Sequence, residues 1–108
     1  MPYYLVQGAY SHEQWAAFVK NPQQNRAELA RTLIESMGGR LLCFFWSFGE
    51  YDALWVAELP DATTVAAIVA AIEAGGIKAA KTTPLLTPEE GIEFLKKASQ
   101  VGYRPPSA

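Results

Sequence analysis

The residues that could act as acids or bases in this sequence are few and widely spaced. His12, the only histidine, comes directly after Ser11 at the start of an expected helix. The positive end of a helix dipole favours the neutral imidazole there, which could serve as a base. Tyr10 lies two positions earlier, and Glu58 ends an apolar segment in which burial would favour the protonated acid. His12, Tyr10 and Glu58 are therefore the candidate catalytic residues.

Each of these groups also has a simpler interpretation. His12 can be a solvated helix-start residue, and Glu58 can pair with an Arg or Lys of a partner chain. Asp52 and Glu58 lie on one strand, six residues and about 20 Å apart, too far for a shared acid–base role. We expect Asp52 to bind backbone amides of a turn instead.

Aromatic side chains are the best candidates for a pocket lining, because rings with a polar edge suit planar organic ligands. They can equally form an aromatic core and a dimer interface. The candidate ligand-binding residues are Tyr4, Tyr10, Trp15, Trp46 and Trp55, with Tyr51 beside them.

Several function classes are disfavoured by composition. The 108 residues carry a net charge of −2 with scattered basic residues, which argues against a nucleic-acid surface. No Gly-rich phosphate loop, nucleophile elbow or Cys-x-x-Cys occurs, and no grouping of ligands suggests a metal, so we expect no metal and no cofactor. No apolar run is long enough to span a membrane, and no secretory signal is visible. The single cysteine, Cys43, lies in an apolar strand and fits a cytoplasmic location.

The order of expected elements predicts a ferredoxin-like α+β fold in one domain, residues 1–108. Ser11 and Gln14 form a capping box, Asn21-Pro22 break and restart the first helical segment, and Gly38-Gly39 end it. Thr87 opens an added C-terminal helix, in which we expect Ile92 and Leu95 to face inward. The expected strands are residues 3–10, 41–48, 53–59 and 77–83, the last at a sheet edge, and the other helices span 11–37 and 61–74.

A two-residue turn at Gly49-Glu50 would decide which side chains of the central hairpin share a face. One face would carry Leu42, Phe44, Trp46, Phe48, Tyr51, Ala53, Trp55 and Ala57. The other would carry Leu41, Cys43, Phe45, Ser47, Asp52, Leu54, Val56 and Glu58. Both faces are apolar at their centres, yet two helices cover only one. The uncovered face predicts a homodimer that packs sheet against sheet.

The same hairpin resembles the GYD-domain family. The pattern is Gly49-Glu50-Tyr51-Asp52, followed by an apolar strand and Glu58-Leu59-Pro60-Asp61, and the Gly38-Gly39 and Thr82-Thr83 pairs also fit. The resemblance covers roughly residues 3–95 and implies a ferredoxin-like fold of the dimeric α+β barrel type. It carries over no catalytic residue.

Three functions remain open at this point. The first is a homodimer that binds an apolar or aromatic metabolite beside the sheet. The second is a cofactor-free oxygenase or isomerase, the chemistry of some dimeric α+β barrels, using Tyr10, His12 or Glu58. The third is a structural or regulatory assembly module without a ligand. A pocket of several hundred Å³ would favour the first two, and a fully packed interior would favour the third.

Overall fold

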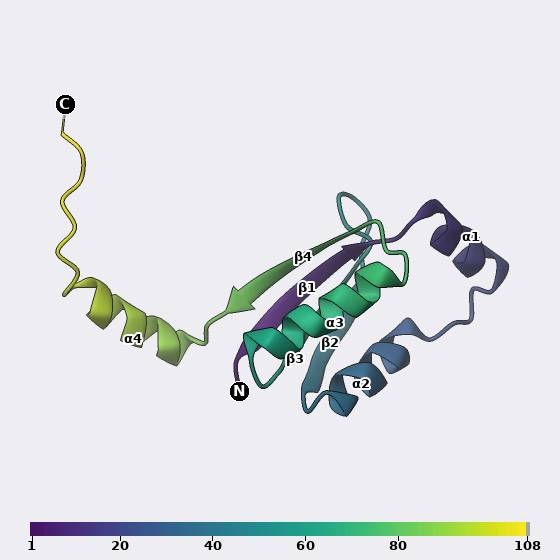
Figure 1. Cartoon of the computed structure of the whole chain (residues 1–108), viewed down its shortest axis with the longest axis horizontal. Coiled ribbons are helices and arrows are strands. Elements are labelled where there is room, and N and C mark those ends of the chain that lie inside the picture. The colour runs from purple at the N-terminus through teal and green to yellow at the C-terminus, as the bar shows by residue number, and fades with distance from the viewer. Residues whose placement is uncertain (108) are drawn as a thin grey trace.

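Four antiparallel strands form a single sheet in the order β2-β3-β1-β4 (Figure 1). The computed structural model describes residues 1–107, so the last residue of the predicted domain, Ala108, lies outside the described residues. The strands are β1 (Tyr3–Ala9), β2 (Arg40–Trp46), β3 (Ala53–Glu58) and β4 (Ala79–Leu85). With β1 in the centre and β4 at the edge, the predicted ferredoxin-like arrangement is confirmed.

Four helices accompany the sheet: α1 (His12–Lys20), α2 (Arg26–Ser36), α3 (Ala62–Ala74) and α4 (Pro88–Ala98). The capping boxes of Ser11 with Gln14 and of Thr87 with Glu90 are both formed as predicted. The predicted restart at Asn21-Pro22 is wrong. Asn21 closes α1 by donating its backbone N–H to Ala17, and Asn25 caps α2 by accepting from Glu28. No helix among residues 1–107 has the length and apolar character needed to cross a membrane.

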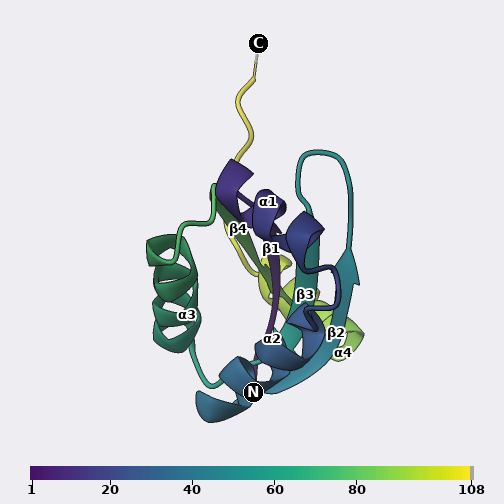
Figure 2. The ribbon, with the colours of Figure 1, turned by 90° about the vertical axis from the view of Figure 1, so that its right-hand side faces the viewer.

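The core lies between one face of the sheet and the helices α2 and α3, which Figure 2 shows on the same side. We call this the inner face. Ile34 of α2 and Ile68 of α3 are almost fully buried against it. The buried cluster contains Tyr4, Val6, Ile34, Leu41, Trp55, Ala57, Leu59, Val65 and Ile68.

The central hairpin corrects the predicted two-residue turn. The last closing hydrogen bond runs from the Ser47 backbone N–H to the Asp52 carbonyl oxygen (2.8 Å), which leaves a four-residue connection, residues 48–51. The pairing register is nevertheless the expected one, because Trp46 lies opposite Ala53. At the other end of β2, a bulge between Leu41 and Cys43 exchanges the predicted sides. Leu41, not Leu42 as predicted, shares a face with Trp55 and Ala57, so Leu41 is buried on the inner face and Leu42 is exposed.

The opposite side of the sheet, which we call the outer face, is not covered by α2 or α3. Its centre is apolar and consists of half-buried and exposed side chains of three adjacent strands: Leu5, Cys43, Phe45, Leu54 and Val56. The register places Leu5 opposite Val56, and Val56 in turn opposite Cys43.

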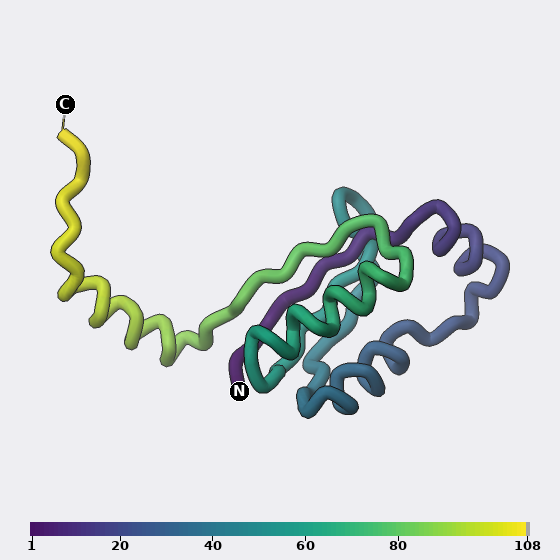
Figure 3. The backbone as a smooth tube through the Cα atoms, in the orientation of Figure 1, coloured from purple at the N-terminus to yellow at the C-terminus, as the bar shows by residue number. Residues whose placement is uncertain are grey.

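The C-terminal helix α4 stands away from the rest of the chain, as the backbone trace shows (Figure 3). None of its side chains is buried. Ile92 is 59% exposed and Leu95 is 62% exposed, so the expectation that they face inward is wrong. The sequence correctly predicted an apolar stripe on α4. It could not predict that no other part of residues 1–107 would pack against this stripe.

Candidate ligand-binding pocket

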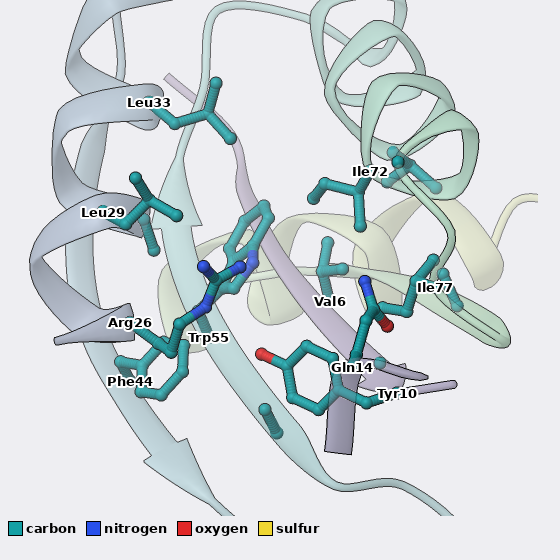
Figure 4. A pocket seen from close by; sticks show the side chains of 16 residues that line it. Val6, Tyr10, Gln14, Arg26, Leu29, Leu33, Phe44, Trp55, Ile72 and Ile77 are labelled. Atoms are coloured by element: carbon teal, nitrogen blue, oxygen red, sulfur yellow. The ribbon is translucent and has the colours of Figure 1, made fainter. Parts of the chain in front are cut away.

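A pocket of about 230 Å³ opens between the inner face of the sheet, α2 and the C-terminal end of α3 (Figure 4). Its walls come from both layers of the fold, the sheet and the helices on its inner face. The lining residues are Val6, Gly8, Tyr10, Gln14, Arg26, Leu29, Ala30, Leu33, Phe44, Ala53, Trp55, Val69, Ile72, Gly75, Ile77 and Ala80.

Most of this lining is apolar. Val6 and Trp55 form the floor on neighbouring strands β1 and β3, where they lie opposite one another in the register. Leu33 of α2 and Ile72 of α3 approach from the two helices (Figure 4). Such a pocket binds an apolar or aromatic group most favourably, because the apolar surfaces of both the pocket and the ligand are removed from water on binding.

Arg26 is the charged residue of the lining. It is the first residue of α2, and Figure 4 shows its guanidinium group extending from that helix toward the pocket. Its Nε is buried and has no hydrogen-bond partner among residues 1–107. The guanidinium carbon lies 5.5 Å from the centre of the Phe18 ring, a cation–π contact that holds the side chain in place without neutralising it.

Tyr10 and Gln14 supply the other polar side chains of the lining. The Tyr10 ring lies in the pocket with its hydroxyl group turned to the side where Arg26 lies (Figure 4). Gln14 completes the capping box, in which its Oε1 accepts from the Ser11 backbone N–H at 3.0 Å. Its amide nitrogen is not used in that bond, so the side chain can still donate to a ligand.

The backbone position of Tyr10 is fixed by the hairpin. The Tyr10 backbone N–H donates to Asp52 Oδ2 at 2.8 Å, and the Asp52 backbone N–H donates to the Gly8 carbonyl oxygen at 2.8 Å. Asp52 thus binds a backbone amide as expected, although that amide belongs to the end of β1 and not to its own turn.

An aromatic cluster surrounds the Tyr10 ring at this end of the pocket. The ring centre of Tyr10 lies 4.8 Å from that of Phe18 and 5.8 Å from those of Trp15 and Trp46. The contacts with Phe18 and Trp15 are edge-to-face, the geometry that aromatic quadrupoles prefer. Trp15 and Trp46 remain 38% and 50% exposed, so the cluster separates this end of the pocket from solvent only in part.

The five aromatic residues predicted from the sequence as ligand-binding thus occupy three environments. Tyr10 and Trp55 line the pocket. Trp15 and Trp46 belong to the cluster around Tyr10, and Tyr4 is buried in the core outside the lining.

The three candidate catalytic residues do not converge. Tyr10 lines the pocket, whereas His12 is exposed at the start of α1 and is not part of the lining. Glu58 lies on the outer side of the sheet, where its Oε1 is 3.2 Å from Nη2 of Arg40. Among residues 1–107, no group of three or more His, Cys, Asp or Glu side chains could hold a metal ion.

The environment of Glu58 overturns two expectations. Its ion-pair partner, Arg40, belongs to the same chain and not to a partner chain. Hydrogen bonds from Arg40 and from the Tyr3 hydroxyl lower the pKa of Glu58 below its ordinary value, whereas burial had been expected to raise it. Glu58 is therefore a charged structural group, not a neutral acid.

Arg26 and Gln14 are the lining residues with polar side chains that sequence reasoning missed. A signal for Arg26 was present, since Arg26, Leu29, Ala30 and Leu33 follow the i, i+3, i+4, i+7 spacing of one helix face. Arg26 therefore heads the apolar stripe of α2, where a solvated charge would be out of place. Gln14 was predicted only as a member of the capping box, and its place in the pocket lining was not predicted.

Comparison with known proteins agrees with this fold. The sequence model of a family described as the GYD domain matches residues 4–95, which include the whole pocket and, apart from Tyr3 at the start of β1, all four strands. No curated protein matches the chain.

Proposed function

The chain belongs to the GYD-domain family, and we propose that it binds a small apolar or aromatic metabolite in the pocket between its sheet and α2 and α3. The observation that carries this proposal is the pocket itself, about 230 Å³ on the inner face of the sheet. Its walls are apolar with a few polar side chains, which is the usual composition of a small-molecule site.

The two other functions considered from the sequence have less support. An assembly module without a ligand needs no internal pocket of this size. For an oxygenase or isomerase, Tyr10 is the only one of the three acid–base candidates in the lining. Binding is therefore the function that these observations support best.

A pair of neighbouring alanines in β4 offers a matched test. Ala80 lies opposite Gly8 and lines the pocket, whereas Ala79 lies opposite Ala9 and its side chain points to the other side of the sheet. Ala80→Leu should fill part of the pocket, and Ala79→Leu should add the same atoms outside it.

The measurement is calorimetric titration with three probe pairs: benzoate and benzamide, 2-naphthoate and 2-naphthamide, octanoate and octanamide. We expect at least one pair to bind the wild type and the Ala79→Leu protein, and to bind Ala80→Leu at least about 10-fold more weakly, since lost burial of two or three methylenes corresponds to that factor. Absence of binding for all six compounds, or equal binding to both variants, would overturn the proposed function. Native mass spectrometry of the purified protein is the complementary search for a co-purified molecule.

The functional unit that we propose is a homodimer formed through the outer face. Leu5, Leu54 and Val56 lie next to one another at the centre of this face, and Phe45 beside them is 61% exposed. A four-stranded sheet is about 19 Å wide, so this face offers on the order of 450 Å². A stable dimer usually buries about 800 Å² on each partner, so the sheet face alone is too small.

Helix α4 supplies additional apolar surface. Its apolar residues Gly91, Ile92, Phe94, Leu95 and Ala98 fall within one face of the helix, and the charged Glu89, Glu90, Glu93, Lys96 and Lys97 fall on the other. An 11-residue helix is about 16 Å long and about 10 Å wide, so it covers about 160 Å² and buries a similar area of its own. We infer that α4 crosses to the second copy, which brings the buried area close to that of a standard dimer.

Sedimentation velocity at micromolar concentration tests this assembly. The wild type should sediment as a dimer, and Leu95→Glu, on the apolar side of α4, should weaken it, whereas Lys97→Glu on the polar side should not. A monomeric wild type would overturn the dimer, and a Leu95→Glu protein as dimeric as the wild type would overturn the crossing of α4.

We also propose a cytoplasmic location for the protein. The basis is its single cysteine, Cys43, which lies on the outer face of the sheet and is a free thiol.

A further inference from the structure

We propose that the ligand is a carboxylic acid, whose carboxylate binds the Arg26 guanidinium while its apolar body fills the rest of the pocket. This inference rests on the proposed function and names the chemical class of its ligand. Three observations carry it: the lack of a partner for Arg26, the donor character of the polar lining, and the presence of a single positive charge.

Arg26 has no acidic partner in the described part of the chain, unlike Arg31 and Arg40. Arg40 pairs with Glu58 at 3.2 Å, and Arg31 lies 3.6 Å from Glu28 on the exposed side of α2. No carboxylate within residues 1–107 lies within ion-pair distance of Arg26, whose Nε is buried and unbonded. Arg26 as a whole is half-buried, but its buried Nε is a donor without an acceptor, which is costly, and an acceptor on a bound ligand would remove that cost.

The remaining polar groups of the pocket can also donate. Tyr10, Gln14 and Trp55 all belong to the lining, and their side chains carry a hydroxyl, an amide NH2 and an indole N–H that can donate. The lining contains no Asp or Glu. Because Arg26 is the first residue of α2, the positive end of that helix dipole lies at the same end of the pocket. A negatively charged acceptor is thus favoured there, and a cationic ligand is disfavoured.

The single charge selects a carboxylate over a phosphate monoester. Arg26 is the only Lys or Arg in the lining, so a monoanion is fully compensated whereas a dianion is not. The flat guanidinium group can donate two parallel hydrogen bonds to a carboxylate, the most specific geometry for this pair. The apolar walls of Leu33, Ile72 and Ile77 then receive the hydrocarbon part of the acid.

The three acid and amide probe pairs test the proposal, because each pair differs in charge and hardly in shape. In the wild type, the acid of a binding pair should bind about 10- to 100-fold more tightly than its amide, the usual range for a charge-assisted hydrogen bond. Arg26→Gln should abolish this preference and leave the affinity for the amide nearly unchanged. Arg26→Lys, which keeps the charge but loses the planar fork, should retain part of it.

Arg31→Gln is the matched control, since it removes the same charge from the same helix outside the pocket. It should keep the full preference for the acid. If acid and amide bind the wild type equally, the carboxylate assignment is overturned while the proposed function stands. If Arg26→Gln keeps the preference, Arg26 is not the carboxylate ligand. If neither compound of any pair binds, the proposed function itself fails.

Discussion

The carboxylate of Asp52 accepts a hydrogen bond of 2.8 Å from the backbone N–H of Tyr10, 42 residues earlier in the chain. The bond joins the central hairpin to the end of β1, directly before α1. Tyr10 also contributes its ring to the pocket, so the last residue of the Gly49-Glu50-Tyr51-Asp52 pattern holds a pocket residue in place from behind. The sequence pattern thus has a structural role at the pocket, although none of its four residues is part of the lining.

Removal of this bond should affect both folding and binding. Asp52→Ala leaves the Tyr10 N–H without its acceptor, and we expect a loss of about 1–2 kcal/mol in the free energy of unfolding, measured by urea titration. Binding of the probe acids should weaken as well, since the Tyr10 ring loses its anchor. Glu50→Ala removes the same charge from an exposed position of the same loop and should change neither quantity. Equal effects of the two variants would show that the Asp52–Tyr10 bond has no special role.

The helix caps and Asp52 show which contacts can be predicted from the sequence and which cannot. The helix caps at Ser11, Asp61 and Thr87 were predictable, because each depends on a contact three residues along the chain. The role of Asp52 toward an amide was also predictable, but its partner was not, since that partner is distant in sequence.

Other features depend on the packed chain as a whole. The bulge between Leu41 and Cys43 has no composition signal, and it alone decides that Leu41 is buried and Leu42 exposed. The exposed position of α4 is of the same kind: its apolar stripe is legible in the sequence, but the surface that covers it is not. The pocket is lined by residues of all four strands and of α1, α2 and α3, so it depends on elements that are distant in sequence.

The Arg40–Glu58 pair predicts a pH dependence of stability. Hydrogen bonds from Arg40 and Tyr3 hold the pKa of Glu58 below its ordinary value of 4.5 in the folded protein. The unfolded chain therefore binds this proton more readily, so the contribution of the pair is present above about pH 4.5 and is lost as the pH falls through the lower folded value. Glu58→Gln should lower Tm at pH 7 and flatten the decline of Tm between pH 5 and pH 3.

Thermal unfolding followed by circular dichroism over this pH range is the measurement. Glu50→Gln, at an exposed loop position, should keep the wild-type profile. Some decline should persist in Glu58→Gln, because the pKa of Asp61 is also lowered by its hydrogen bonds with Thr64 at the start of α3. A Glu58→Gln profile parallel to that of the wild type would contradict the assignment.

Gly39, between α2 and β2, is required for close packing. A Cβ at this position would meet the Glu58 carbonyl oxygen, and it would lie 2.6 Å from Leu59 Cδ2 and 3.1 Å from Ile34 Cγ2. Ile34 and Leu59 are fully buried, so neither can move away freely. Gly39→Ala should therefore reduce the free energy of unfolding by about 1–3 kcal/mol. Gly102→Ala, where no atom lies within 4 Å of the added carbon, should have almost no effect in the same urea titration.

Val56 is the position at which the dimer is most directly tested. It lies between Leu5 of β1 and Cys43 of β2 at the centre of the outer face, and it is half-buried in the single chain. In a two-fold dimer, Val56→Lys would place two like charges in an apolar interface without partners, which costs several kcal/mol. The dissociation constant should rise at least about 100-fold, so that the variant sediments as a monomer at micromolar concentration.

The helical and strand content of the Val56→Lys protein should stay that of the wild type, because the lysine can reach solvent from the outer face of the monomer. Val19→Lys is the control, since Val19 is 78% exposed on α1 and lies outside the outer face. That variant should remain a dimer. A Val56→Lys protein that sediments with the wild type would show that the outer face is not the interface, and the apolar centre formed by Leu5, Leu54 and Val56 would then need another partner.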